Sequence, residues 1–211
     1  MKFSPVLYTF LLVYVVAVTI TYANSRIITQ DIIYDYLIKI GYNAENANSY
    51  FKYAFDNQWI KYLFLPIILV FKTFFATFCI SISIYLSGKK VDLNSVIRVV
   101  MMAQLVWFIE PLFQLFWFKA IQTQYSLNDI ENFYTFSLND FISKQSALTS
   151  FSNLFSLISL YELIYCLFMG YGISGIVDGS FKTYFFIVVR GYGLGSLLIG
   201  MLMTFLHIAY S

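Results

Sequence analysis

The sequence is short of charge. Only 11% of its 211 residues are Asp, Glu, Lys or Arg, whereas an ordinary soluble domain has about 25%. The net charge of +2 is too small for the clustered cations that bind nucleic acid, so no nucleic-acid partner is expected. The two cysteines, Cys79 and Cys166, lie inside apolar runs and form no CxxC pair. We therefore expect buried free thiols and no disulfide framework.

Motifs for catalysis, cofactors and metals are also missing. The single histidine, His207, has no cluster of His, Cys, Asp or Glu near it in the sequence, and a metal site needs several such ligands. There is no Gly-x-Ser-x-Gly elbow and no HExxH sequence. The glycines after Arg190 do not follow a strand pattern, which excludes a nucleotide-binding loop. We expect a protein that is not an enzyme and holds neither a cofactor nor a metal.

Hydrophobic residues make up 60% of the chain and aromatic residues 21%, with a mean hydropathy of +0.73. Five stretches contain the roughly 20 apolar residues that a membrane-spanning helix needs, at about 3–22, 59–86, 93–118, 148–174 and 183–208. The sequence predicts an all-α membrane bundle of five transmembrane helices, forming a single domain over 1–211. The first stretch resembles a signal peptide ending near Ala23, but it exceeds the usual 7–15 apolar residues, so we expect a membrane anchor.

Basic residues near the short turns predict the orientation, since short cytoplasmic loops carry an excess of Lys and Arg. One turn contains Lys89 and Lys90, with Asp92 at its end and Arg98 just beyond it. Placing this turn in the cytoplasm puts the N-terminus inside and the C-terminus outside. The long connections 23–58 and 119–147 then lie outside.

Both outer connections contain helical patterns. Apolar residues recur at helical spacing through 27–40, and Gly41 is a helix stop. This helix lies either at the membrane interface or against the protein's own outer loops, and both interpretations stay open. Ser126 precedes Asp129 by three residues, as Ser137 precedes Asp140, which is the spacing of a helix cap. Two short amphipathic helices are predicted in this second connection.

Lys72, Glu110 and Glu162 are ionisable residues well inside the predicted spans, where charge is costly and commonly marks a functional site. Lys72 and Glu162 are near the middle of the second and fourth spans, and Glu110 is in the outer half of the third. Counting depth along antiparallel helices puts Lys72 and Glu162 within about one turn of each other. We expect Lys72 to pair with Glu162, or else with Glu110. The pair is either a proton or ion relay or a static contact, within the chain or with a partner subunit.

Pro111 follows Glu110 inside the third span. A proline within a helix lacks an N–H group and leaves a carbonyl near residue 107 free, which permits a kink. Pro111 is therefore a candidate hinge, with a fixed bend as the alternative.

Small residues mark candidate packing surfaces on the last two spans. Gly191 and Gly195 have the GxxxG spacing that allows another helix to approach closely. Ser152, Ser156 and Ser159 line one side of the fourth span in its outer half. These surfaces predict either packing between spans four and five or the interface with a partner protein.

The segment Gly88-Lys-Lys-Val-Asp-Leu-Asn-Ser-Val-Ile-Arg-Val-Val, a proline within the span that follows, and a long final hairpin at 161–205 resemble the Yip family of five-span membrane proteins. The resemblance covers about residues 60–208. Eukaryotic members engage Rab-type GTPases from a long polar cytosolic segment, whereas this chain enters the membrane almost at once, so that activity is not carried over. Some bacterial members are associated with ABC-type exporters as accessory membrane subunits.

Three functions follow, in this order. The first is a non-enzymatic membrane subunit or scaffold of a larger assembly, with an ABC-type exporter or secretion complex as the host that the resemblance implies. The second is a small transporter or channel that uses Lys72, Glu110 and Glu162, and the third is a membrane-shaping protein. The expected partners are the lipid bilayer and other membrane subunits, and no small-molecule substrate is identifiable. The Ile-, Asn- and Lys-rich composition is compatible with an AT-rich bacterial genome and an inner-membrane location.

Overall fold

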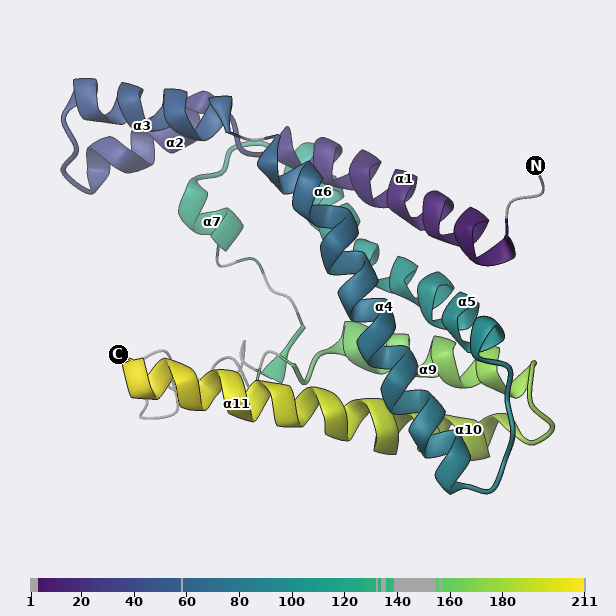
Figure 1. The fold of residues 1–211 in the computed structure, drawn as a ribbon. Helices are drawn as coiled ribbons and strands as arrows, with labels where there is room; N and C mark the ends of the chain where they lie inside the picture. The colour runs from purple at the N-terminus through teal and green to yellow at the C-terminus, as the bar shows by residue number, and fades with distance from the viewer. Residues whose placement is uncertain are drawn as a thin grey trace. The chain divides into compact units, whose positions relative to one another are not determined.

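The computed structural model describes residues 4–57, 59–131, 133, 136–138, 155 and 157–210. The all-α fold expected from the sequence is confirmed for these residues (Figure 1). The α-helices are α1 (Pro5–Ser25), α2 (Gln30–Lys39), α3 (Ala44–Asp56), α4 (Ile60–Leu86), α5 (Leu93–Ala103), α6 (Ile109–Phe116), α7 (Leu127–Glu131), α9 (Leu160–Ser174), α10 (Phe181–Val188) and α11 (Leu194–Tyr210). A 3-10 stretch occupies Gln104–Phe108, and π-helical stretches occupy Trp117–Ile121 and Val189–Gly193.

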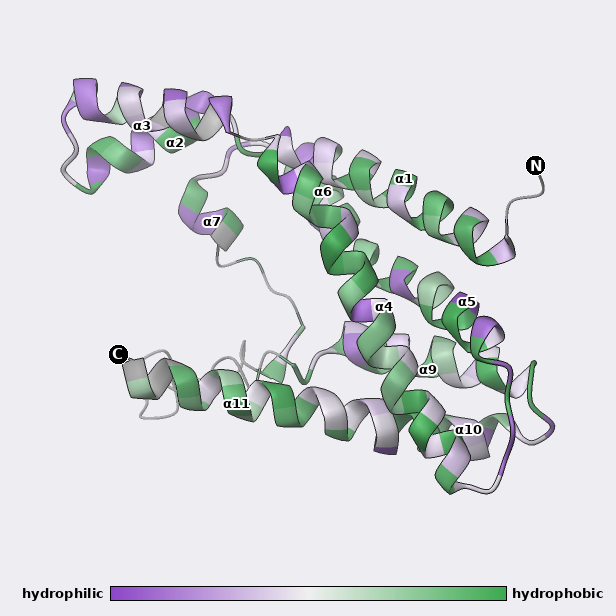
Figure 2. Cartoon of the chain, viewed as in Figure 1, coloured by the Kyte–Doolittle hydropathy of each residue, from purple (hydrophilic) through white to green (hydrophobic). Residues whose placement is uncertain are grey.

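Within the described residues, four helices are long and apolar enough to cross a membrane. They are Pro5–Ser25, Ile60–Leu86, Leu93–Ile121 and Phe181–Leu206. Figure 2 shows the hydrophobic residues along α1, α4 and α11, in contrast with the more hydrophilic α2 and α3. Four of the five predicted spans are therefore confirmed as long apolar helices, and they indicate a multi-pass membrane protein.

The fourth predicted span, over 148–174, is not one continuous helix, because it is interrupted at residues 157–159. Residues 157–159 are not helical and α9 begins only at Leu160, while 148–154 and 156 lie outside the described residues. Ser159 is extended and pairs with Ser137 in an isolated antiparallel bridge. Its hydroxyl accepts a hydrogen bond of 3.1 Å from the Glu162 amide, which caps the helix start. With 15 residues, α9 is about 22 Å long, shorter than the roughly 30 Å of a bilayer core.

The chain divides into two compact units. Unit 1 comprises Met1–Val13, Phe71–Trp107 and Tyr134–Ser211, and unit 2 comprises Tyr14–Val70 and Phe108–Phe133. The helices α1 and α4 each contribute residues to both units.

Helix α9 packs against α10 and α5 within unit 1. A Cβ atom at Gly170 would lie 2.9 Å from the Phe185 Cα of α10, and one at Gly172 would lie 2.5 Å from a Val99 methyl of α5. Glycine is required at Gly170 because the atoms it meets belong to the backbone of α10, whereas at Gly172 a larger residue would have to displace the Val99 side chain. The predicted packing between the fourth and fifth segments is thus present.

In unit 2, α2 and α3 pack against each other as a hairpin. The turn between them contains Gly41 with φ +95°, a left-handed conformation that favours glycine, at the predicted helix stop. The Tyr125 hydroxyl donates a hydrogen bond of 3.0 Å to the Ile27 carbonyl and connects the segment before α7 to the segment before α2.

Ser126 and Asp129 form reciprocal capping bonds at the start of α7. The Ser126 amide and hydroxyl each donate to the Asp129 carboxylate at 2.7 Å, and the Asp129 amide donates to the Ser126 hydroxyl at 3.4 Å. These bonds from Ser126 hold the pKa of the Asp129 carboxyl below its usual range. The second predicted cap uses Asp140, which lies outside the described residues, and the backbone of Ser137 forms an isolated bridge with Ser159.

Asp92 caps α5 where the chain turns after α4. Its carboxylate accepts hydrogen bonds from the Ser95 hydroxyl at 2.8 Å, the Ser95 amide at 2.9 Å and the Asn94 amide at 3.4 Å. The bond from the Ser95 side chain is the largest cause that lowers the pKa of Asp92, and the nearby charge of Arg98 acts in the same direction. A carboxyl whose pKa is lower in the folded state stabilises that state only while it is ionised.

We therefore expect the start of α5 to open as the pH falls below about 4, where Asp92 takes up a proton. Hydrogen exchange at the Asn94 and Ser95 amides, corrected for intrinsic rates, will lose protection in this range. Asp92→Asn caps the helix without titrating, so its protection will not change with pH. An equal acid-induced loss in Asp92→Asn would contradict this assignment.

Candidate functional site

Lys72 and Glu162, which the sequence places at similar depth, lie close together in unit 1. The Lys72 Nζ is 4.4 Å from the centroid of the Trp107 ring, a cation–π contact. Lys72 and Glu162 interact electrostatically, although no direct salt bridge of 4.0 Å or less joins them. Lys72 is about 18 Å from the first residue of α4 and about 21 Å from the last, at 1.5 Å per residue. An acid and a base thus interact near the middle of a helix that is long and apolar enough to span a membrane.

Aromatic side chains surround this pair. The Trp107 ring centroid is 5.8 Å from that of Tyr165, which is 5.3 Å from that of Tyr192. The Phe75 ring lies 6.1 Å from Tyr192 on another side. The Tyr192 hydroxyl and the Glu162 carboxylate interact with each other. Because Tyr165 is 1% exposed and Tyr192 9% exposed, the carboxylate is bordered by buried rings.

Three of the site residues lie where a helix departs from regular α geometry. Trp107 is in the 3-10 stretch and Tyr192 in a π stretch, while Glu162 is in the first turn of α9. Pro111 explains the first departure, because it has no N–H to donate to the Trp107 carbonyl four residues earlier. Short 3-10 and π segments inside long helices are frequent at functional sites. The hinge proposed for Pro111 thus coincides with a local change of helix type.

Gly191 and Gly195 bring the last span close to α4. A Cβ atom at Gly191 would collide with the Ser83 hydroxyl and would lie 2.8 Å from the Cys79 carbonyl oxygen, and one at Gly195 would lie 2.8 Å from the Cys79 sulfur. The partner of this GxxxG surface is therefore α4 of the same chain. This approach places Tyr192, next to Gly191, beside the middle of the site.

Hydroxyl-bearing residues form a line along α4. Thr73, Thr77 and Ser81 follow one another at intervals of four residues, so they lie on one face of the helix. The buried Gln104 side chain donates a hydrogen bond of 2.6 Å to the Thr73 hydroxyl. The hydroxyls of Thr77 and Ser81 are buried without a hydrogen-bond partner, and such groups are costly unless water or an ion meets them.

The other predicted site residues lie elsewhere. Glu110 is in the first turn of α6, in unit 2, and has interactions of its own. Ser159 caps α9 rather than lining a helix face, and Ser152 and Ser156 lie outside the described residues. Lys89 and Lys90 are exposed in the turn before Asp92.

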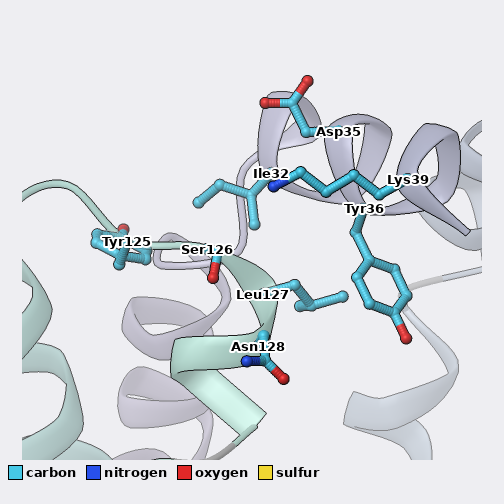
Figure 3. Close-up of a pocket in the computed structure, with 8 residues that line it drawn as sticks. All are labelled: Ile32, Asp35, Tyr36, Lys39, Tyr125, Ser126, Leu127 and Asn128. Carbon is cyan, nitrogen blue, oxygen red and sulfur yellow. The ribbon is translucent and has the colours of Figure 1, made fainter.

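A second feature, in unit 2, is a cavity of about 290 Å³ between α2 and the start of α7. It is lined by Ile32, Asp35, Tyr36, Lys39, Tyr125, Ser126, Leu127 and Asn128. Figure 3 shows Lys39 extending along α2 toward Ile32, with Tyr36 on the side of Leu127. One acid and one base four residues apart on a helix attract each other, so this cavity carries little net charge.

Among the residues that the structure describes, no group of three or more His, Cys, Asp or Glu side chains is placed to hold a metal ion. Comparisons with protein-family models, curated proteins and solved structures found no match to this chain. The site must therefore be interpreted from its own chemistry. One carboxylate, one ammonium group and a phenol that interact with one another can exchange a proton or hold a small cation.

Sequence reasoning missed most of the residues around the pair. The four-residue spacing of Thr73, Thr77 and Ser81 was the only signal available for the hydroxyl line. Trp107, Tyr165 and Tyr192 had none, because aromatic residues are frequent throughout the chain.

Proposed function

We propose that this chain is a small multi-pass membrane carrier that moves a proton or another small cation through the site at Lys72 and Glu162. The observation that carries this proposal is the convergence of an acid, a base and the Tyr192 hydroxyl at mid-span. Charged side chains at this depth are costly, and they commonly mark ion pathways and proton relays.

Two further features support a pathway. Helix α9 starts beside the middle of α4, as do the broken helices that form the midplane sites of secondary transporters. The line of Thr73, Thr77 and Ser81 leads from the site toward the end of α4 that carries Lys89 and Lys90. These hydroxyls supply polar groups to a cation or water along that half of the helix.

The proposal also includes the membrane topology, that is, the number of crossings and the side on which each turn and terminus lies. Helix α9, with Ser159 before it, makes a fifth crossing that returns the chain to the basic side. The turn with Lys89 and Lys90 then faces the cytoplasm, with the N-terminus inside and the C-terminus outside. The amphipathic α2 and α3 lie in the first outer connection, and the host is a bacterial inner membrane.

A flux assay in proteoliposomes tests the carrier. We expect a potassium diffusion potential to drive proton uptake, read from an enclosed pH-sensitive dye, and Glu162→Gln to reduce the rate by roughly tenfold or more because the exchanging carboxylate is lost. Glu162→Asp keeps a carboxylate and will retain part of the rate. Glu45→Gln, on α3, is the control and will match the native chain. Unchanged flux in a folded Glu162→Gln would contradict the proposal.

A second candidate function is the non-enzymatic subunit, and a separate observation favours it. In α1, only 17% of the most apolar 18-residue stretch is buried within the chain. The same share is buried in the corresponding stretch of Phe181–Leu206. These faces are available to lipid or to the helices of a partner. The resemblance to the Yip family supports an exporter or secretion complex as the host. Purification from native membranes in mild detergent, with mass spectrometry, would show a partner at fixed stoichiometry.

A further inference from the structure

The site already holds an ammonium group, which belongs to the chain itself. The Lys72 Nζ lies over the face of Trp107, and the rings of Tyr165 and Tyr192 continue the aromatic surface toward Glu162. Aromatic faces with one carboxylate nearby are the groups by which proteins recognise organic ammonium ions. The position of Lys72 thus shows what kind of ligand the site accommodates.

The Lys72 side chain is also the part of the site that can move away from the aromatic rings and Glu162. Tyr165 and Tyr192 are buried and Trp107 is half-buried, whereas the Lys72 side chain is exposed. No direct salt bridge of 4.0 Å or less holds its ammonium to Glu162. A four-carbon stem gives a lysine the freedom to move its charged end away from a surface.

We propose that the site binds a small organic ammonium ion in the place of the Lys72 ammonium, and that Lys72 releases a proton as the ion arrives. This assignment rests on the proposed carrier and names its cargo and its counter-ion. Glu162 provides the negative charge, and Trp107, Tyr165 and Tyr192 provide the aromatic faces.

The balance of charge at the site explains why Lys72 would release a proton when the ion binds. Glu162 offers one negative charge, so two cations beside it would leave an excess positive charge at mid-span, which is costly. If one N–H bond of the Lys72 ammonium breaks and the electron pair stays on nitrogen, a neutral amine remains and the proton passes to water. One cation enters and one proton leaves, so the charge of the site is unchanged. The other titratable groups beside the site, on α9 and the last span, are Tyr165, Cys166 and Tyr192.

The test uses tetramethylammonium, which carries no proton that it could release itself. The purified full chain in lipid nanodiscs is titrated by calorimetry, and proton release is followed with a dye in weak buffer. We expect one proton released per ion bound, and an affinity that rises by about tenfold per pH unit. Glu162→Gln will not bind the ion, and uncharged tert-butanol will not bind the native chain.

Substitutions at Lys72 test whether the released proton comes from this side chain. Arginine keeps its charge at all accessible pH values, so Lys72→Arg will weaken binding by roughly tenfold or more. Lys72→Met has no competing charge and will keep binding. Lys61→Arg is the matched control, because Lys61 is another α4 lysine over an aromatic ring, that of Tyr62. Native affinity in Lys72→Arg, or binding by the native chain without proton release, would overturn the proposal.

The same preparation separates this inference from the proposed function. Proton flux in proteoliposomes without tetramethylammonium binding would overturn the ammonium site and leave the carrier standing. Binding with proton release, but without proton flux even when tetramethylammonium is supplied on the opposite side of the membrane to exchange for the proton, would overturn the carrier and leave a cation-binding site.

Discussion

Gly191→Ala is expected to separate α4 from the last span and to destabilise the protein by about 3 kcal/mol, the upper part of the usual cost of overpacking. The added methyl group would lie 2.8 Å from the Cys79 carbonyl oxygen and would collide with Ser83. The first of these is a backbone atom of a helix, so it cannot rotate away. Relief requires a shift of the whole helix, which also moves Tyr192 from Glu162.

Gly193→Ala is the matched control for this prediction. Its added methyl group would have its nearest neighbour at 3.9 Å, an ordinary contact with Val189. Alanine is also a better helix former than glycine by up to about 1 kcal/mol, so this variant will be as stable as the native chain or more stable. The measurement is the free energy of unfolding in mixed micelles titrated with denaturing detergent. Equal stability of the two variants would contradict the close approach of α4 to the last span.

The second large effect concerns the charge pair. Glu162→Gln and Lys72→Met are each expected to destabilise the protein by about 2 kcal/mol, below the 3–5 kcal/mol typical of pairs in direct contact. Each single change leaves an opposite charge without its partner in the membrane. The double variant removes both charges and will recover at least about 1 kcal/mol of the summed loss. The same unfolding titration measures all three variants.

Glu110→Gln completes this experiment, because the sequence offers Glu110 as the other partner of Lys72. We expect the effects of Glu110→Gln and Lys72→Met to add, since the carboxylate whose charge acts on Lys72 is that of Glu162. Coupling of Lys72 to Glu110 without coupling to Glu162 would reverse the pairing. Additive effects for both carboxylates would show that Lys72 is independent of either.

Hydropathy was sufficient to locate the long helices α1 and α4, because the bilayer selects for length and apolar content alone. Depth counting was sufficient to bring Lys72 and Glu162 together, since antiparallel helices rise equally per residue. The start of α9 could not be found in this way. The apolar run over 148–174 has no interruption in hydropathy, whereas the break depends on the pairing of Ser159 with Ser137, which is a tertiary contact.

The spacing of the glycines also predicted part of the helix packing. The spacing of Gly191 and Gly195 predicts that a helix approaches closely, but spacing alone does not identify that helix. In the structure the neighbour is α4, and the contact between α9 and α10 uses Gly170 instead. The change to 3-10 geometry around Trp107 follows from Pro111, whereas the π stretch around Tyr192 has no comparable signal in the sequence.

The short length of α9 has a consequence for biogenesis. An apolar helix of 15 residues is below the roughly 20 residues with which a segment enters the bilayer on its own. If α9 crosses the bilayer as proposed, its insertion needs neighbours that are already in place or arrive with it, and α10 follows after a brief turn. The two helices would leave the translocon as one hairpin, so the Glu162 site would be completed only after synthesis has passed Tyr192.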